Sequence, residues 1–346
     1  MKALRRKGPD HIELINADDP HPSAQEVIVR VSHVGICGSD VHRLHEDNPK
    51  WDSIFLGHEF SGVVACCGSA VVNISEGQRV AVAPLVPCHE CDLCAEGHFS
   101  QCPHYSFIGS RRNGAFAEFV NVPAKNVIPI SDSLSLKRAA LLEPLTVVLH
   151  PLMMVGNQFG ALETVVVTGL GAIGLLAVQV FKFLGARNIV VSDMVDAKLN
   201  LALELGATHA VNVTRQKIED VTDPLGGAWM VFESSGATPA KQAAVRVARS
   251  RGTILLVGTS PRDVTFEASL FERISRKELC LLGSWMNYSA PWPGREWKMA
   301  CQLLEWGHIA DSKLVTHELD LSDGQRAVDI VTKNTEPFIK VMFHGV

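Results

Sequence analysis

The hydrophobic positions of this chain follow two patterns, with a change near residue 163. Before it, short apolar runs alternate with polar positions and are interrupted by turns, most clearly over 26–31, 61–65 and 79–82. Alternation over four to eight residues is typical of half-buried strands. We therefore expect a strand-rich region over residues 1–148.

From about residue 163, strand patterns alternate with helical ones. The expected strands cover 164–167, 188–191, 210–213, 229–232 and 253–257, and the expected helices cover 172–184, 196–205 and 241–248. Strands separated by helices of about ten residues indicate a parallel sheet with crossover helices. The tail from about 295 has a mixed pattern that does not assign it to either region.

A glycine-rich loop follows the first strand of the second region. Its sequence fits G-x-G-x-x-G and reads Gly169-Leu170-Gly171-Ala172-Ile173-Gly174. The glycines permit a tight turn, close approach of a pyrophosphate and packing of helix on strand, and the helix N-terminus faces the phosphates. Asp193 ends the next strand, where a carboxylate accepts hydrogen bonds from ribose hydroxyls and repels a 2′-phosphate. NAD is therefore predicted; the alternative is a turn-and-packing motif with Asp193 as a helix cap.

Nine cysteines stand among the 346 residues. Four of them have the spacing C-x₂-C-x₂-C-x₇-C, namely Cys88, Cys91, Cys94 and Cys102. Four thiolates close a tetrahedral shell, which is typical of structural zinc. An iron–sulfur cluster is the alternative, although the ferredoxin run has three residues before its last cysteine rather than seven. The remaining cysteines outside recognisable motifs are expected to be buried apolar side chains, and they are Cys66, Cys67, Cys280 and Cys301.

Charge and length narrow the function classes. The length predicts roughly two domains. A net charge of −5 provides no broad basic field, and residues 88–102 contain no Lys or Arg, so neither a nucleic acid nor a membrane is expected as a partner. The basic N-terminus lacks a following apolar stretch, and no apolar run is long enough to span a bilayer. We expect a cytoplasmic protein, in which a cysteine cluster is more typical of a metal site than of disulfides.

A second set of metal-ligand side chains is spread over three segments. Cys37 lies in G-I-C-G-S-D, His58 and Glu59 lie in L-G-H-E, and Glu143 lies in L-L-E-P. Each of them alone has a structural explanation. Together, one thiol, one imidazole and carboxylates suit a zinc ion with a position open for a substrate oxygen.

Polar residues near Cys37 fit roles around such a zinc. Asp40 is placed to accept a hydrogen bond from the second N–H of the ligand histidine and so fix its tautomer. Ser39 and His42 are placed to pass a proton from a bound alcohol to solvent.

These motifs, in this order, resemble the zinc-dependent medium-chain alcohol and polyol dehydrogenase family over essentially the whole chain. The resemblance implies a GroES-like, partly open β-barrel catalytic domain over 1–148, an inserted Rossmann NAD-binding domain over 149–290 and a return to the catalytic domain over 291–346. It also implies one catalytic and one structural Zn²⁺, hydride transfer to NAD, and a homodimer or homotetramer.

The resemblance also assigns the metal ligands. Cys37 and His58 would bind the catalytic zinc, with Glu59 as a ligand or as a partner of the ligands. Glu143 stands where ordinary alcohol dehydrogenases have a second cysteine, a departure that resembles the polyol branch, including sorbitol dehydrogenases. Direct zinc binding by Glu143 and binding through water both remain open.

Two longer stretches, 107–114 and 283–297, resemble the galactitol-1-phosphate dehydrogenase branch of the family. This resemblance implies oxidation of a secondary alcohol of a hexitol phosphate to the ketose phosphate. The alternatives are an unphosphorylated polyol of the sorbitol or xylitol type, L-threonine, and a catalytically silent NAD-binding protein.

Candidate substrate residues are basic or aromatic. Arg43, Arg111 and Arg112 would supply guanidinium groups to a phosphate; the alternative is that the Arg111–Arg112 pair only braces a domain interface. Trp285 and Asn287 would line a sugar pocket, or else belong to the core or to a subunit contact.

Overall fold

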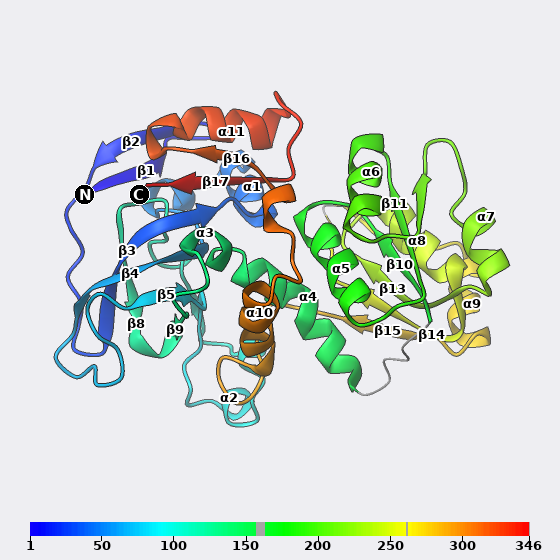
Figure 1. Ribbon diagram of the computed structural model, residues 1–346, viewed down its shortest axis with the longest axis horizontal. Helices are drawn as coiled ribbons and strands as arrows, with labels where there is room; N and C mark the ends of the chain where they lie inside the picture. The colour runs from blue at the N-terminus through cyan, green and yellow to red at the C-terminus, as the bar shows by residue number, and fades with distance from the viewer. Residues whose placement is uncertain (157–162, 261, 346) are drawn as a thin grey trace. The chain divides into compact units, whose positions relative to one another are not determined.

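The chain forms two compact units in the computed structural model, which describes residues 1–156, 163–260 and 262–345 (Figure 1). Unit 1 comprises Met1–Pro144, Tyr288–Trp306 and Asp311–Val346, and unit 2 comprises Leu145–Asn287 and Gly307–Ala310. Unit 1 is therefore discontinuous along the chain. The domain limits expected at 148/149 and 290/291 stay predictions.

A seven-stranded sheet is the centre of unit 1. Its path runs β16-β17-β3-β4-β5-β9, and β8 pairs with β3. The strands are β3 (Glu26–Gly35), β4 (Glu59–Cys67), β5 (Arg79–Val82), β8 (Phe119–Pro123), β9 (Val127–Pro129), β16 (Val315–Leu319) and β17 (Lys340–His344). The β16–β17 pair is parallel and the other pairs are antiparallel. The three strands expected over 26–31, 61–65 and 79–82 are confirmed as β3, β4 and β5.

Short elements surround this sheet. Two further strand pairs are β1 (Lys2–Arg6) with β2 (Ile12–Asn16) and β6 (Leu85–Val86) with β7 (Ser106–Phe107). The helices of unit 1 are α1 (Gly38–His45), η1 (Pro49–Ser53), α2 (Asp92–Ala95), η2 (Phe99–Gln101), η3 (Ala124–Asn126), α3 (Leu136–Ala139), α10 (Arg295–Glu305), η6 (Asp311–Lys313), η7 (Leu321–Asp323) and α11 (Gly324–Lys333). Apolar side chains of β3, β4, β5 and α11 share one buried core.

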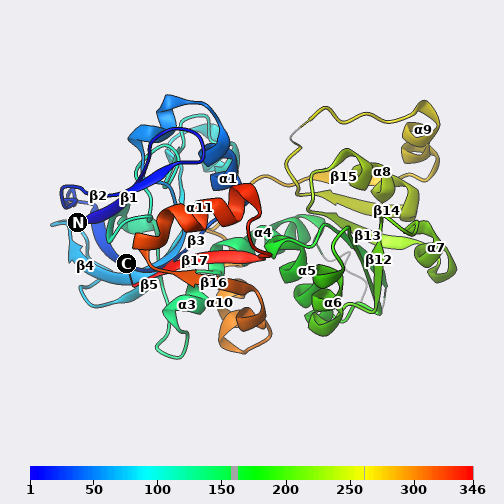
Figure 2. The ribbon, with the colours of Figure 1, turned by 90° about the horizontal axis from the view of Figure 1, so that it is seen from above.

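Unit 2 is built on a six-stranded, all-parallel sheet of order β12-β11-β10-β13-β14-β15. The strands are β10 (Thr164–Thr168), β11 (Asn188–Asp193), β12 (His209–Asn212), β13 (Ala228–Glu233), β14 (Ala248–Leu256) and β15 (Cys280–Gly283). The helices are α5 (Ala172–Phe183), α6 (Asp196–Leu205), α7 (Glu219–Thr222), η5 (Asp223–Leu225), α8 (Thr238–Val247) and α9 (Ala268–Arg276), while α4 (Leu142–Val155) starts in unit 1 and continues into unit 2. Figure 2 shows α5 and α6 on one face of the sheet and α8 and α9 on the other.

The expected parallel sheet with crossover helices is confirmed. One boundary differs: Ala248 was expected to end a helix, but its φ of −62° and ψ of 130° are extended, and it begins β14. Ala248 follows the last turn of α8 and pairs with Ala228 of β13, which a local sequence pattern does not specify. Among the described residues, no helix combines the length and apolarity needed to cross a membrane.

Candidate active site and metal centres

One group of metal-ligand side chains forms where β3 ends and β4 begins. Cys37 is the N-cap of α1, just beyond β3, and His58 and Glu59 stand at the start of β4. The antiparallel register pairs Gly35 with Glu59, so the ends of these strands lie together. One donor atom from each of Cys37, His58 and Glu59 falls within 4.8 Å of the other two. Sulfur, imidazole and carboxylate donors at this separation suit a zinc ion with a position left for substrate.

Asp40 lies next to the Nδ1 side of the His58 ring. His58 and Asp40 are both buried, and His58 Nδ1 lies 3.4 Å from Asp40 Oδ1, an ion-pair contact without the alignment of a good hydrogen bond. The backbone N–H of Cys37 donates to Asp40 Oδ2 at 3.1 Å. Burial lowers the pKa of His58, but the interactions with Asp40 and Cys37 together outweigh it and raise this pKa well above the usual value. With Nδ1 facing Asp40, the other ring nitrogen is left to bind a metal.

Lys340 neutralises Glu59. Its Nζ donates to Glu59 Oε1 at 2.9 Å, to Oε2 at 2.6 Å and to the carbonyl of Ile36 at 3.1 Å, and both charged side chains are buried. A Cβ at position 35 would lie 2.4 Å from Glu59 Oε2, so Gly35 leaves room for the carboxylate. Lys340 was not predicted, because it follows Glu59 by 281 residues and belongs to no local motif.

Glu143 lies outside the group of donors. It is the second residue of α4 and is buried, but among the described residues its carboxylate is not within 4.8 Å of all three donors. Zinc binding by Glu143 therefore stays a prediction. Its charge adds to the effect of burial in raising the pKa of Tyr288, whose hydroxyl oxygen accepts the Leu85 N–H at 3.0 Å. Glu143 thus lies near the buried phenol of Tyr288, within unit 1.

Three polar residues of α1, Ser39, His42 and Arg43, follow Cys37 in the chain. Arg43 Nη1 donates to Ser39 Oγ at 2.9 Å and to Asp40 Oδ1 at 3.2 Å. His42 is exposed, and within the described residues no hydrogen bond joins its imidazole to Ser39. The positions i, i+3 and i+4 place Ser39, His42 and Arg43 on neighbouring faces of the helix.

The other two predicted arginines are held by neighbours. Arg111 Nη1 donates to the Tyr105 carbonyl at 2.7 Å, and its guanidinium stacks 3.7 Å above the Tyr105 ring. Arg112 Nη2 forms an ion pair with Glu26 Oε1 at 2.6 Å and donates to the Asn121 carbonyl at 3.3 Å. The Arg112 ion pair connects the segment after β7 to β3, which is a structural role.

The predicted sugar-pocket residues belong to unit 2. Trp285 is 55% exposed, whereas Asn287 is buried and donates to the Thr146 hydroxyl. Asn287 therefore connects the segment after β15 to α4. A role in substrate binding stays a prediction for both residues.

The four-cysteine lobe brings its thiols together. All four Sγ atoms lie within 4.8 Å of one another, with Cys88–Cys102 at 3.5 Å, Cys91–Cys102 at 3.9 Å and Cys88–Cys94 at 4.0 Å. A Zn–S bond of about 2.3 Å in a tetrahedron places sulfurs about 3.8 Å apart, so the lobe fits zinc. Backbone hydrogen bonds lower the pKa of Cys88 to about 6, whereas burial raises the pKa of Cys94 to about 12.

Aromatic rings attach this lobe to the returning segment of unit 1. Trp292 packs edge-on against His89 at 5.3 Å and Phe99 at 5.1 Å, and it stacks on Tyr288 at 5.1 Å. The contacts of Trp292 with His89 and Phe99 join residues about 200 positions apart, and no local sequence pattern indicates them. The lobe thus packs on Trp292, which in turn stacks on Tyr288, the tyrosine that lies near Glu143.

The expectation that the remaining cysteines are buried is wrong. Cys280 is exposed on β15, an edge strand of the unit 2 sheet, and Cys66, Cys67 and Cys301 are only partly buried. For Cys280 the expectation failed because an edge strand has no neighbour on one side, and a single sequence does not indicate which strand is at the edge.

The glycine loop has the geometry that a dinucleotide requires. Gly169 has a φ of +83°, and a Cβ at position 174 would lie 1.9 Å from the Gly169 carbonyl oxygen. A Cβ at position 171 would meet nothing within 4 Å, so the backbone there is open to a phosphate. Gly171 is the N-cap of α5, whose N-terminus is a site for an anion. The strand, loop and helix therefore fit a pyrophosphate.

Asp193 ends β11 beside this loop. Its Oδ2 accepts the Leu170 N–H at 2.7 Å, and its Oδ1 accepts the N–H groups of Met194 and Val195 at 2.8 and 3.0 Å. These bonds fix the carboxylate next to the glycine loop, where a ribose is expected.

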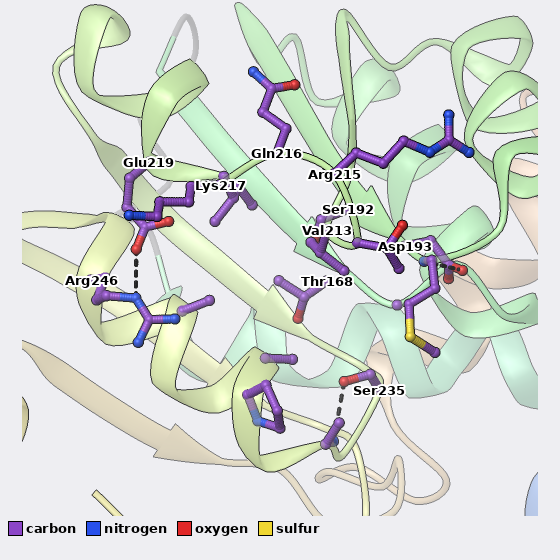
Figure 3. A pocket seen from close by; sticks show the side chains of 18 residues that line it. Thr168, Ser192, Asp193, Val213, Arg215, Gln216, Lys217, Glu219, Ser235 and Arg246 are labelled. Atoms are coloured by element: carbon purple, nitrogen blue, oxygen red, sulfur yellow. Dashed lines mark hydrogen bonds and ion pairs between the residues drawn. The ribbon is translucent and has the colours of Figure 1, made fainter. Parts of the chain in front are cut away.

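A cavity of about 840 Å³ lies in unit 2 at the carboxyl ends of β10, β11 and β12. Figure 3 shows Asp193 and Arg215 on one side of this cavity and the Glu219–Arg246 ion pair on the other. Thr168 lines the cavity, and its buried hydroxyl has no hydrogen-bond partner among the described residues. Ligands of open α/β sheets bind at the carboxyl ends of the strands, so the cavity is the expected nucleotide site.

Comparison with known proteins finds relatives for both the GroES-like and the nucleotide-binding parts of the chain. Residues 23–132 match the alcohol dehydrogenase GroES-like domain, and residues 172–306 match the zinc-binding dehydrogenase domain. Galactitol 1-phosphate 5-dehydrogenase of Escherichia coli is 37% identical over 90% of both chains, and a crystal structure of the E. coli galactitol-1-phosphate dehydrogenase has a TM-score of 0.95, with 99% of this chain and 100% of that chain covered at 35% identity.

Other relatives have different substrates in their names. D-arabitol-phosphate dehydrogenase of Enterococcus avium is 31% identical over 100% of this chain and 97% of its own, and L-threonine 3-dehydrogenase of Stenotrophomonas maltophilia is 33% identical over 96% of this chain and 95% of its own. A zinc-binding dehydrogenase of Sinorhizobium meliloti, solved with bound NADP, has a TM-score of 0.87 at 31% identity, with 99% of this chain and 98% of that one covered. The chain belongs to the zinc-binding medium-chain dehydrogenase family, with one four-cysteine zinc site, one Cys-His-Glu zinc site and a site for NAD(P).

Proposed function

We propose that this protein oxidises a secondary alcohol of a hexitol phosphate, of the galactitol 1-phosphate type, to the ketose phosphate, with NAD⁺ as the hydride acceptor. As a family member it is a zinc-dependent, NAD(P)-linked alcohol or polyol dehydrogenase. The observation that carries the finer proposal is the 37% identity to galactitol 1-phosphate 5-dehydrogenase over 90% of both chains. A second relative named for a phosphorylated polyol supports it.

The residues around Cys37 have separate tasks in this reaction. Zinc, when bound, supplies a Lewis acid that acidifies the substrate hydroxyl, and the nicotinamide supplies the hydride acceptor. Cys37 and His58 hold the metal, and Asp40 fixes the orientation of the imidazole from 3.4 Å. Lys340 balances the charge of Glu59, so that this buried carboxylate does not add a full negative charge beside the reacting carbon.

The proton of the alcohol leaves through α1. The substrate hydroxyl donates to Ser39 Oγ, which already accepts a hydrogen bond from Arg43 and retains a second lone pair. As Ser39 takes up this proton it gives up its own hydroxyl proton, which reaches the exposed imidazole of His42 through solvent, since no hydrogen bond joins the two side chains among the described residues. The alcohol thus loses a hydride and a proton and becomes a ketone.

Asp193 favours NAD⁺ over NADP⁺. Its carboxylate stands at the end of β11, held by three backbone N–H groups beside the glycine loop. A 2′-phosphate at this position would meet a fixed negative charge.

A substrate panel followed by NADH absorbance tests the proposal. Galactitol 1-phosphate, galactitol, sorbitol, xylitol and L-threonine are compared by kcat/KM, and galactitol 1-phosphate is expected to give the highest value. L-Threonine is the second candidate, because relatives of that activity are 33% identical over nearly the whole chain. A higher kcat/KM for threonine or for a free polyol would overturn the proposal.

A variant of Cys37 distinguishes an active dehydrogenase from a catalytically silent NAD-binding protein. Cys37→Ser should abolish turnover and lower the zinc content from two ions per chain to one, while NADH binding measured by fluorescence persists. Turnover retained by this variant would contradict the role of Cys37.

A further inference from the structure

A cationic pair stands beside an indole ring at the outer end of α1. The Arg43 guanidinium carbon lies 5.5 Å from the centre of the Trp51 ring, and Lys50 Nζ lies 4.7 Å from the same centre. The Trp51 indole N–H donates to Glu46 Oε2 at 2.9 Å, and Asn48 caps η1 by accepting the Lys50 N–H at 3.1 Å. The ring is therefore a fixed surface that holds both cations in one place.

Arg43 uses only one edge of its guanidinium. Its Nη1 makes both hydrogen bonds, to Ser39 and Asp40. Its Nε and Nη2 have no hydrogen-bond partner among the described residues, and the side chain is 19% exposed. The Nε–Nη2 edge of a guanidinium is a fork that matches two oxygens of a phosphate. Because the other edge is fixed by α1, this fork is already oriented before a ligand binds.

We infer that Arg43, assisted by Lys50, binds the phosphate group of the substrate. The inference rests on the proposed function and assigns the residues that would recognise a phosphorylated polyol. Arg43 contacts Ser39, the residue that accepts the substrate proton, so a polyol whose hydroxyl reaches Ser39 extends from there toward the Arg43 side of α1. Two cations match a phosphate monoester, which carries between one and two negative charges at neutral pH.

The charges around the pair agree with this role. Glu46 is held by Trp51 and Asn48, and the carboxylate of Asp52 is paired with Arg6. Arg43 and Lys50 have no ion pair with either of these two acids among the described residues, and the ion pair of Arg43 with Asp40 uses Nη1 alone. In a chain of net charge −5, an anionic substrate needs such a local group of cations.

The other two candidate arginines are less suited to binding the substrate phosphate. Arg111 lies on Tyr105, and Arg112 is paired with Glu26. Neither makes a hydrogen bond to Ser39, Asp40 or any other residue of α1 among the described residues. Of the three arginines considered from the sequence, Arg43 is therefore the one connected to the reacting end of the site.

The experiment compares kcat/KM for galactitol 1-phosphate with that for galactitol, as a ratio, in Arg43→Met, Arg43→Lys, Lys50→Met and Arg111→Met. The ratio cancels any loss caused by disturbing Ser39 or Asp40, since both substrates use these residues. Arg43→Met should lower the ratio roughly ten- to hundredfold, the range for a lost hydrogen-bonded charge. Arg43→Lys should recover part of it, and Lys50→Met should lower it several-fold through KM alone. Arg111→Met is the matched control and should keep the wild-type ratio.

A binding measurement accompanies the kinetics. The Kd of galactitol 1-phosphate is measured by tryptophan fluorescence in the presence of NADH, and zinc content is measured for every variant. Weaker binding of galactitol 1-phosphate to Lys50→Met, with two zinc ions per chain retained, supports the inference even where Arg43→Met is poorly folded.

Each outcome decides between the two proposals. If the wild-type protein does not prefer galactitol 1-phosphate to galactitol, the proposed function fails at the phosphate. If the wild type prefers it and both Arg43→Met and Lys50→Met keep that preference, the proposed function stands and this inference is overturned. A ratio lowered by Arg111→Met instead would place the phosphate at Arg111 and overturn the inference as well.

Discussion

The buried Lys340–Glu59 pair offers the strongest test of how unit 1 is held together. Lys340→Met keeps the length of the apolar stem and removes the ammonium group. Glu59, which is 1% exposed, then loses both of its hydrogen bonds from Nζ, at 2.9 and 2.6 Å, and the Ile36 carbonyl loses its partner at 3.1 Å. Removing one partner of a buried ion pair costs about 3–5 kcal/mol. Against a total stability of about 5–15 kcal/mol, the variant should unfold at a much lower urea concentration.

The assay is urea unfolding of the zinc-loaded protein, followed by tryptophan fluorescence. Glu59→Gln/Lys340→Met should be more stable than Lys340→Met alone, because the double variant leaves no buried charge without a partner. Lys333→Met is the matched control: Lys333 pairs with Asp329 on the surface and its side chain is 53% exposed, so its removal should change the free energy of unfolding by less than about 1 kcal/mol. A Lys340→Met protein that unfolds like this control would refute the reasoning.

Three further predictions concern pH, metal and cofactor. Burial raises the pKa of Glu26, but hydrogen bonds, including the one from Arg112, lower this pKa overall from 4.5 to about 2. The ionised Glu26 therefore contributes to stability above pH 4.5, and this contribution is lost as the pH falls toward 2. Glu26→Gln should lack the contribution, and acid-unfolding curves of identical shape and midpoint for the variant and the wild type would contradict this. Removing zinc with a chelator should let iodoacetamide label Cys88 before Cys94 at neutral pH, since their pKa values are about 6 and about 12; mass spectrometry measures the order, and equal labelling rates would disprove it. Asp193→Ser should raise kcat/KM for NADP⁺ relative to NAD⁺ by roughly tenfold, equivalent to about 1.4 kcal/mol, and an unchanged ratio would remove Asp193 as the selecting residue.

The features that could be predicted from sequence are those with local causes. The glycine loop is specified within six residues, because the tight turn at Gly169 and the packing at Gly174 depend on the absence of a Cβ. The cysteine lobe is specified within fifteen residues, because short spacings force the sulfurs to converge on one ion. The convergence of the four thiols is confirmed, whereas the binding of a nucleotide by the glycine loop stays a prediction that the geometry of the loop fits.

The features that could not be predicted depend on distant pairs. Lys340 reaches Glu59 only because β17 is inserted beside β3, and a lone lysine near the end of a chain has no distinguishing pattern. Arg112 was a candidate for binding phosphate, but it is paired with Glu26, 86 residues earlier. The partner of a charged side chain is determined only when the strands pair in register. The cationic residues could therefore be identified from the sequence, but which of them remain available to a ligand could not.

The position of β17 also has a consequence for biogenesis. β17 lies between β16 and β3, and it follows the long segment of unit 2, Leu145–Asn287, along the chain. On the ribosome, Glu59 is made 281 residues before Lys340, a delay of roughly 15–60 s at about 5–20 residues per second. During this interval the last residues of β3, His33 to Gly35, lack their β17 partner, and Glu59 lacks its counter-charge. An open strand edge is a template for pairing with other chains, so the nascent protein should depend most on chaperones while unit 2 is being synthesised.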